Sequence, residues 1–465
     1  MLFQSSGFLF IFLPLFLLCM ALAPAGRPRA LCILIFSYLF YSGSEPYFLL
    51  LLLTSSVVDY TAAIRLSRAR TPRRRKAWLV LSICVNLGLL GFYKYGGLIV
   101  PYLAPLRDLL AVPLPNKRYF MTFALPAGIS FYTFQTMSYT IDVYRGRLSP
   151  EKSFLGFCNY VAYLPQLIAG PIERFGHLFP QLHEMALKKT KPQWSAGLDR
   201  LALGVAEKLL IADSCGLIVD IVAQSNPEQS FLTAWAVALG FGMQILFDFA
   251  AYTHMAIGIS LLLGVKLSEN FLSPYQAPNP QQFWRRWHVT LSNWFRDYLF
   301  IPLGGSRKGS FRTFLNIFIT FALCGLWHGA GWNFVAWGVF HGVLVGGYHL
   351  IKRIFPRITL PRFLGVGLTF LLVQTAWVLF RITDAGQVGA IWKAMFGGAP
   401  VSLGVLSPAD ILFLALVTAI SLFAPNAQKR WPGSSGWPES VLLWALALFA
   451  VFNSPQINQF IYFQF

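Results

Sequence analysis

Charged residues are scarce in this sequence: they make up 12% of the 465 residues, whereas a soluble domain has roughly a quarter. Hydrophobic residues make up 56%, and apolar runs of about 20 residues, enough to span ~30 Å of hydrocarbon, recur from end to end. The scarcity of charge excludes an ordinary soluble protein. We therefore expect an all-α polytopic membrane protein with about 11 or 12 transmembrane helices, plus re-entrant and interfacial helices.

Cysteine is sparse, and the common cofactor motifs are missing. The six cysteines are scattered singly, without a CxxC pair, which argues against a disulfide framework or a cysteine-based zinc site. The sequence contains no Walker loop, GxGxxG or HExxH motif. We therefore expect neither a metal ion nor a bound cofactor, and a nucleotide would have to be held by scattered side chains.

Acidic residues are half as frequent as basic ones, with 18 Asp and Glu against 37 Lys and Arg. The densest basic cluster, RLSRARTPRRRK at 65–76, is a short loop between apolar runs, and Arg27 and Arg29 precede the hairpin that leads to it. Short cytoplasmic loops collect Lys and Arg in this way. We expect a multi-pass protein of the cytoplasmic (inner) membrane, with a retained first span and its N-terminus outside, rather than a nucleic-acid-binding protein.

Two stretches interrupt the apolar pattern. Residues 154–170 contain internal proline and glycine, which predicts a broken or re-entrant segment. Residues 280–300 follow Asn279, a good helix cap, and place large aromatic residues at three- and four-residue spacing. We expect an interfacial helix over 280–300 that carries His288.

Arg285 and Arg296 of this predicted helix belong to a strongly basic region. Residues 266–312 hold seven Lys and Arg against two acidic residues, which favours an anionic ligand or an anionic lipid. The alternative interpretation is a helix that lies on the membrane surface through its aromatic anchors. The charge pattern alone does not decide between them.

His328 lies inside an apolar run, in CGLWHGAGWNF at 324–334. A histidine there costs free energy unless it is hydrogen-bonded or hydrated, so it is a candidate functional residue. A partly hydrated imidazole can act as a general base at neutral pH; the alternative is a neutral ring bonded to a neighbouring group. Glycines beside Trp327 would leave room for a tunnel. We interpret His341 and His349 as packing or interfacial residues, and Asp248 as a carboxylate bonded to a neighbouring helix.

These stretches resemble the membrane-bound O-acyltransferase family, in the bacterial branch that O-acetylates alginate. The resemblance rests on residues 269–309 and 324–342, with shorter similar stretches at 131–146, 164–175 and 460–465. It implies one membrane-bound O-acyltransferase domain over 1–465, in which spans surround a cytoplasmic funnel and a tunnel. The expected parts are N-terminal spans in 1–152, a catalytic core in 153–353 and C-terminal spans in 354–465.

The resemblance also implies a reaction. His328 corresponds to the catalytic histidine of the family and would act as base or proton relay, and His288 corresponds to its second histidine. The expected donor is a cytosolic acetyl thioester, acetyl-CoA. An extracytoplasmic partner protein would then carry the acetyl group to a secreted polysaccharide such as alginate. Further candidates for lining the substrate path are Asn270, Trp287, Arg285, Arg296, Trp327 and Asp248.

The sequence departs from the branch at one motif. It reads DFAAYTHMAIG where the branch commonly has DFSGYSDMAIG, so His254 replaces an acidic residue. Three alternatives stay open: transfer of D-alanine from a carrier protein to teichoic acid, a transporter or lipid flippase with a histidine relay, and a non-catalytic scaffold. The first belongs to the same family, the transporter predicts that no thioester is consumed, and the scaffold predicts that His328→Ala leaves function intact.

Overall fold

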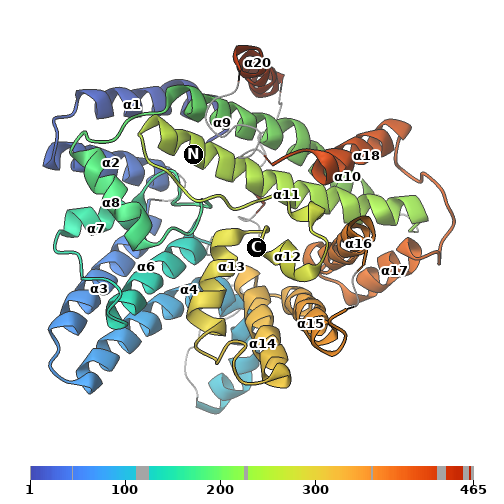
Figure 1. Ribbon diagram of the computed structural model, residues 1–465, viewed down its shortest axis with the longest axis horizontal. Helices are drawn as coiled ribbons and strands as arrows, with labels where there is room; N and C mark the ends of the chain where they lie inside the picture. Colours follow the sequence, from blue (N-terminus) through green and yellow to red (C-terminus); the bar gives the residue numbers. More distant parts are fainter. Residues whose placement is uncertain are drawn as a thin grey trace. The chain divides into compact units, whose positions relative to one another are not determined.

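The computed structural model describes residues 2–43, 46–110, 125–224, 229–357, 360–426, 436–453 and 460–461, and its regular elements there are all helices (Figure 1). Six of these helices are long and apolar enough to cross a membrane. The expected all-α polytopic membrane architecture is therefore confirmed. Several other spans that we expected are short or broken helices in this part of the chain, such as Pro408–Phe423 and Trp437–Asn453.

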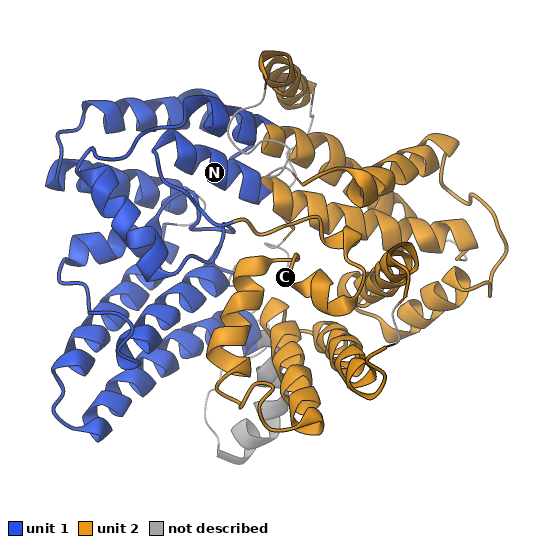
Figure 2. Ribbon diagram, viewed as in Figure 1, with its two compact units in different colours: residues 1–202, 252–268 blue, residues 203–251, 269–465 orange. Residues whose placement is uncertain are grey.

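The chain folds into two compact units, which Figure 2 distinguishes by colour. Unit 1 comprises Met1–Ala202 and Tyr252–Ser268, and unit 2 comprises Leu203–Ala251 and Glu269–Phe465. All eight candidate site residues named from the sequence lie in unit 2, whereas His254 lies in unit 1. Unit 2 is therefore the part of the fold that positions the candidate site.

Unit 1 is built from the N-terminal helices. The elements are η1 (Phe8–Phe12), α1 (Leu13–Leu22), α2 (Arg27–Ser42), α3 (Phe48–Arg68), α4 (Pro72–Leu110), α6 (Ile129–Tyr144), α7 (Phe154–Ala162), α8 (Phe175–Ala186) and most of α9 (Trp194–Ala206). Asp59 is buried between α3, α4 and α6, where it accepts hydrogen bonds from Ser82, Asn86 and Thr140. Hydroxyl and amide donors thus hold these three helices together within an apolar bundle.

The segment 154–170 of unit 1 is broken, as predicted from its sequence. Helix α7 ends at Ala162, and turns follow up to residue 170. Gln166 donates from Nε2 to the carbonyl oxygen of Tyr160 at 2.9 Å and so satisfies part of this buried, non-helical backbone. Irregular backbone inside a membrane protein requires such internal partners.

Unit 2 holds the remaining helices. They are η2 (Glu207–Ala212), α10 (Asp213–Gln224), α11 (Phe231–Leu262, whose end passes into unit 1), η3 (Pro274–Gln276), α12 (Pro280–Trp284), α13 (Val289–Phe295), η4 (Arg296–Phe300), α14 (Ser310–His328), α15 (Trp332–Ile354), α16 (Arg362–Arg381), α17 (Ala385–Met395), α18 (Pro408–Phe423) and α20 (Trp437–Asn453). Several of their aromatic side chains, among them Trp287, Trp337 and Trp377, form a buried cluster that is described below.

The interfacial helix that we predicted over 280–300 is not continuous, and this prediction is corrected. Asn279 caps its start as expected, because its Oδ1 accepts from the Gln282 N–H at 2.9 Å. The helix ends at Trp284, and His288 has a left-handed backbone with φ 42°. An L-residue in that conformation interrupts a right-handed helix. The segment therefore forms α12, a turn at His288, α13 and the π-helical η4.

Helices α14 and α15 pack unusually closely, because glycines face each other where they cross. A Cβ atom built at Gly338 would lie 2.3 Å from the carbonyl oxygen of Phe321 and 3.0 Å from the Cα of Gly325. Small residues that allow such backbone approach are typical of helix pairs in membranes. The close contact fixes the two helices that carry the candidate catalytic groups.

We expect Gly338→Ala to destabilise the protein by about 1–3 kcal/mol, the usual cost of forcing extra volume into a packed contact. Thermal unfolding of the detergent-solubilised protein measures the change. Gly347→Ala on the same helix is the matched control, since a Cβ atom there meets nothing within 4 Å. Equal midpoints for the two variants would contradict the prediction.

Candidate active site

His328 is the last residue of α14 and is buried, with 3% of its surface exposed. Its ring lies among three aromatic rings, with centroid distances of 4.9 Å to Trp327, 5.1 Å to Trp337 and 5.2 Å to Phe380. The chain leaves the helix through Gly329, where a Cβ atom would lie 2.1 Å from the Phe334 ring. Glycine is therefore required for the turn that keeps His328 at a helix end inside the core.

The structure brings His288 close to the same place. Its ring centroid lies 4.6 Å from that of Phe249 and 6.4 Å from that of Trp327. Because Trp327 also contacts His328, the two predicted histidines both neighbour one indole ring. Sequence analysis named His288, Trp327 and His328 as site residues, and the structure places all three together.

Asn270 and Trp287 hold the turn at His288. Asn270 accepts on Oδ1 from the N–H and the hydroxyl of Thr290, at 3.2 and 2.7 Å, and its carbonyl oxygen accepts from the Val289 N–H. The same Oδ1 lies 3.4 Å from His288 Nδ1. Trp287 is buried against Trp377, with ring centroids 4.9 Å apart. Both residues therefore position His288.

Burial lowers the pKa of His288 to about 3. Desolvation disfavours the charged imidazolium, so the ring is neutral at physiological pH. A base with so low a pKa accepts a proton poorly near pH 7. His288 is therefore suited to orienting groups by hydrogen bonding rather than to accepting a proton.

We expect the protein to lose stability as the pH falls from about 6.5, the ordinary pKa of histidine, towards 3. In this range the unfolded chain binds a proton at His288 that the folded protein excludes, so acid favours unfolding. His288→Gln removes this titration and should flatten the dependence of the unfolding midpoint on pH. His349→Gln is the control, and identical pH slopes for wild type and His288→Gln would refute the argument.

Two further residues of the aromatic cluster were not named as site residues from the sequence. His341, which we interpreted as a packing residue, is 1% exposed and accepts on Nδ1 from the Trp284 indole N–H at 3.2 Å. Trp337, one turn earlier on α15, has its ring centroid 4.9 Å from that of His341. The signal available in the sequence was the four-residue spacing of Trp337, His341, Val345 and His349, which places them on one helix face.

A pocket of about 650 Å³, called the basic pocket below, opens beside this cluster. Arg285 and Arg296, both exposed, contribute to its lining. Its wall also includes Thr313, Ile317, Thr320 and Cys324 of α14 and Val345 and His349 of α15. The next turn on the same face of α14 is His328, and the next turns of α15 are His341 and Trp337. Both helix faces thus lead from the basic pocket to the candidate catalytic groups.

Asp248 does not line the basic pocket but belongs to a buried ion cluster. Its Oδ1 lies 2.8 Å from Lys208 Nζ, which also contacts Asp213 Oδ1 at 2.7 Å. Its Oδ2 accepts from the Ile461 N–H at 2.6 Å. The neighbouring Phe460 packs on Phe249, which itself contacts His288. Asp248 therefore fixes residues 460–461 beside the candidate site.

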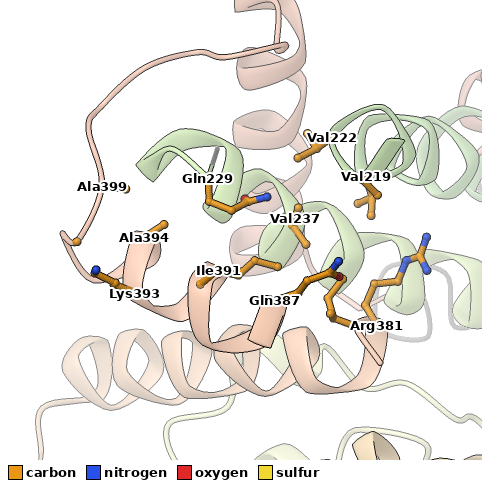
Figure 3. A pocket seen from close by; sticks show the side chains of 14 residues that line it. Val219, Val222, Gln229, Val237, Arg381, Gln387, Ile391, Lys393, Ala394 and Ala399 are labelled. Atoms are coloured by element: carbon orange, nitrogen blue, oxygen red, sulfur yellow. The ribbon is translucent and has the colours of Figure 1, made fainter. Parts of the chain in front are cut away.

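A second recess of about 520 Å³ lies where α10, α11, α16 and α17 meet (Figure 3). Its lining includes Gln229, Gln387 and Arg381, and Arg381 forms an ion pair with Asp220 at 2.9 Å. Arg381 directly follows Phe380, whose ring contacts His328. The recess therefore lies at the His328 end of α14, whereas the basic pocket extends from residue 313 near the other end.

Comparison with known proteins gives a consistent result. Residues 145–382 match the membrane-bound O-acyltransferase family. The chain is 38% identical to the "probable alginate O-acetylase AlgI" of Pseudomonas putida over 90% of this chain and 85% of that protein. It is 34% identical to the peptidoglycan O-acetyltransferase of Helicobacter pylori over 89% and 83% of the two chains. A teichoic acid D-alanyltransferase of Bacillus subtilis is 27% identical over 49% of this chain and 59% of its own length.

Proposed function

This chain belongs to the membrane-bound O-acyltransferase family, in its alginate O-acetylation branch, and from that premise we propose that acetyl-CoA is its acetyl donor and binds in the basic pocket. As a member of this branch the chain is a multi-pass membrane O-acetyltransferase. The observation that carries the proposal is the path from Arg285 and Arg296 along α14 and α15 to His328. Arginines recognise phosphate groups, which acetyl-CoA carries at the end opposite its thioester.

The chemistry required is acyl transfer to a hydroxyl group. An alcohol is a poor nucleophile until a base removes its proton, and a positioned histidine contributes about 10²–10⁴-fold to such a step. His328 would accept the proton of the attacking hydroxyl as the oxygen bonds to the carbonyl carbon. The aromatic rings around it exclude water, which would otherwise compete by hydrolysing the thioester.

The acceptor would approach from the other side of the membrane. Support comes from the second recess, which lies at the His328 end of α14 and carries amide and cationic side chains. We propose that an extracytoplasmic partner protein receives the acetyl group there and carries it to a secreted polysaccharide. The arrangement of basic loops supports the cytoplasmic (inner) membrane as the location, with the N-terminus outside.

The donor is tested with purified protein in nanodiscs, radiolabelled acetyl-CoA and a co-purified outer partner from the same organism. Release of free CoA together with labelled acetyl on the partner or its polysaccharide would support the proposal. If acetyl-CoA stays intact while D-alanine is transferred from a carrier protein, the donor assignment is wrong and the D-alanyl alternative replaces it. Transport of a solute without thioester cleavage would indicate a transporter.

Replacing Arg285 and Arg296 together with alanine should raise the KM for acetyl-CoA by about 2–30-fold, since ion pairs of exposed arginines contribute about 0.2–1 kcal/mol each. The kcat should change little, because the arginines bind the donor far from the reacting carbon. Acetyl-pantetheine lacks the nucleotide, so its KM should not change. Arg312→Ala, an exposed arginine outside the pocket lining, is the control. Equal increases in the KM values of acetyl-CoA and acetyl-pantetheine would show that the arginines do not act by binding the nucleotide.

A further inference from the structure

Two buried N–H groups beside His328 have no acceptor among the described residues: Nε1 of Trp337 and Nε2 of His341. Trp337 is 0% and His341 1% exposed. An indole nitrogen only donates. His341 Nδ1 accepts from Trp284, so a neutral imidazole carries its proton on Nε2. Both atoms are therefore donors, and a buried donor without an acceptor costs about 1–3 kcal/mol.

Three other indoles of unit 2 donate to acceptors within the protein. Trp377 donates to the Tyr275 hydroxyl at 3.0 Å, Trp392 to the Thr375 carbonyl at 3.1 Å, and Trp235 to the Met395 carbonyl at 3.0 Å. Aromatic packing in this fold is therefore compatible with a satisfied N–H. A phenylalanine at 337 would fill a similar space without leaving a buried donor, so packing alone does not account for the indole there.

The two donors lie between the basic pocket and His328. The Trp337 ring is 5.1 Å from the His328 ring and 4.9 Å from the His341 ring. One and two turns beyond His341, on the same face of α15, Val345 and His349 line the pocket. Along this face of α15, His341 and then Trp337 follow the pocket-lining residues on the way to the His328 ring.

We propose that Trp337 and His341 donate hydrogen bonds to the carbonyl oxygen of the acetyl thioester; this assignment rests on the proposed function. The acceptor hydroxyl oxygen bonds to the carbonyl carbon, and its proton passes to His328. The π pair moves onto the carbonyl oxygen, where the two N–H groups stabilise the alkoxide. When that pair returns, the carbon–sulfur bond breaks, and the leaving thiolate takes the proton from His328.

Kinetics of acetyl-CoA consumption test the assignment. Trp337→Phe keeps an aromatic ring and removes the N–H, so kcat should fall by about 10²–10³-fold, the usual cost of one such donor, with KM changed less than about twofold. His341→Gln, which keeps a donor, should retain more activity than His341→Leu. Trp377→Phe is the matched control because its N–H already has a protein acceptor. Wild-type kcat in Trp337→Phe would overturn the proposal.

Infrared spectroscopy separates direct contact from an effect on folding. In His328→Ala, which should bind acetyl-CoA without turnover, the carbonyl stretch of the ¹³C-labelled acetyl group should move to lower wavenumber than in water-free solvent. Adding Trp337→Phe should reverse part of that shift, whereas Trp377→Phe should not. An unchanged band in both double variants would show that other groups, such as ordered water, satisfy these donors. If wild type consumes no acetyl-CoA although D-alanyl transfer proceeds, the proposed donor and this assignment fail together. If wild type consumes acetyl-CoA and the kcat of Trp337→Phe is unchanged, only this assignment is refuted.

Discussion

His328→Ala is expected to lower acetyl-CoA consumption by about 10²–10⁴-fold, the contribution of one positioned general base. The residue ends α14, and its ring packs against Trp327, Trp337 and Phe380, none of which can act as a base. His288 neighbours the same indole, that of Trp327, but its low pKa makes it a poor substitute. The measurement is the initial rate of labelled CoA release in nanodiscs, at saturating acetyl-CoA and with the partner present.

The control for this experiment is His183→Ala, an exposed histidine on α8 of unit 1. Both variants should elute as wild type does in size-exclusion chromatography and unfold at similar temperatures, which separates chemistry from folding. If His328→Ala retained full activity, the proton would have to go elsewhere. The scaffold and transporter alternatives would then regain support.

Lys208→Met should destabilise the protein by about 3–5 kcal/mol, the cost of removing one partner from a buried ion cluster. Lys208 lies within 2.8 Å of both Asp213 and Asp248, and its side chain is 4% exposed. The substitution leaves two carboxylates in the interior without their cation. Thermal unfolding in detergent, together with the yield of folded protein, measures the loss.

A triple variant tests the cause. Lys208→Met combined with Asp213→Asn and Asp248→Asn removes both uncompensated charges, and should recover much of the lost stability. Lys188→Met is the control for loss of a lysine, since Lys188 is exposed and donates to a single backbone carbonyl, that of Ala21. Wild-type stability in the single variant would mean that the carboxylates are neutralised in another way.

Much of the architecture could be predicted from the sequence, because hydrophobic length and the scarcity of charge determine a membrane helix almost locally. The break within 154–170 was predictable for the same reason, since a proline inside a helix removes a backbone hydrogen bond and clashes with the preceding turn. Asn279 also capped its helix as expected. These predictions depend on residues within a few positions of one another.

The break at His288 could not be predicted, because its left-handed backbone depends on an earlier segment. The Val289 N–H donates to the carbonyl oxygen of Asn270, and the Leu272 N–H donates to that of Arg286. The spacing of aromatic residues over 280–300 suits a continuous helix equally well, so periodicity gave the wrong answer there.

The role of His341 and the partner of Asp248 were hidden for a similar reason. His341 meets Trp284 across 57 residues, and Asp248 meets Ile461 across 213 residues. The sequence around a buried histidine or a buried carboxylate looks the same whether that residue packs, forms an ion pair or catalyses. Only the partner that bonds to each side-chain nitrogen or oxygen in the folded protein distinguishes these cases.

The regular spacing on α15 has a consequence for selectivity. From His349 in the basic pocket to Trp337 beside His328 is 12 residues, or about 18 Å of rigid helix at 1.5 Å per residue. In the proposed binding mode, with the nucleotide end of the donor at the arginines, that length would set how far the acyl group reaches. Propionyl or butyryl thioesters would crowd the closed aromatic end, so discrimination between short acyl chains would follow from the number of helical turns rather than from any single side chain.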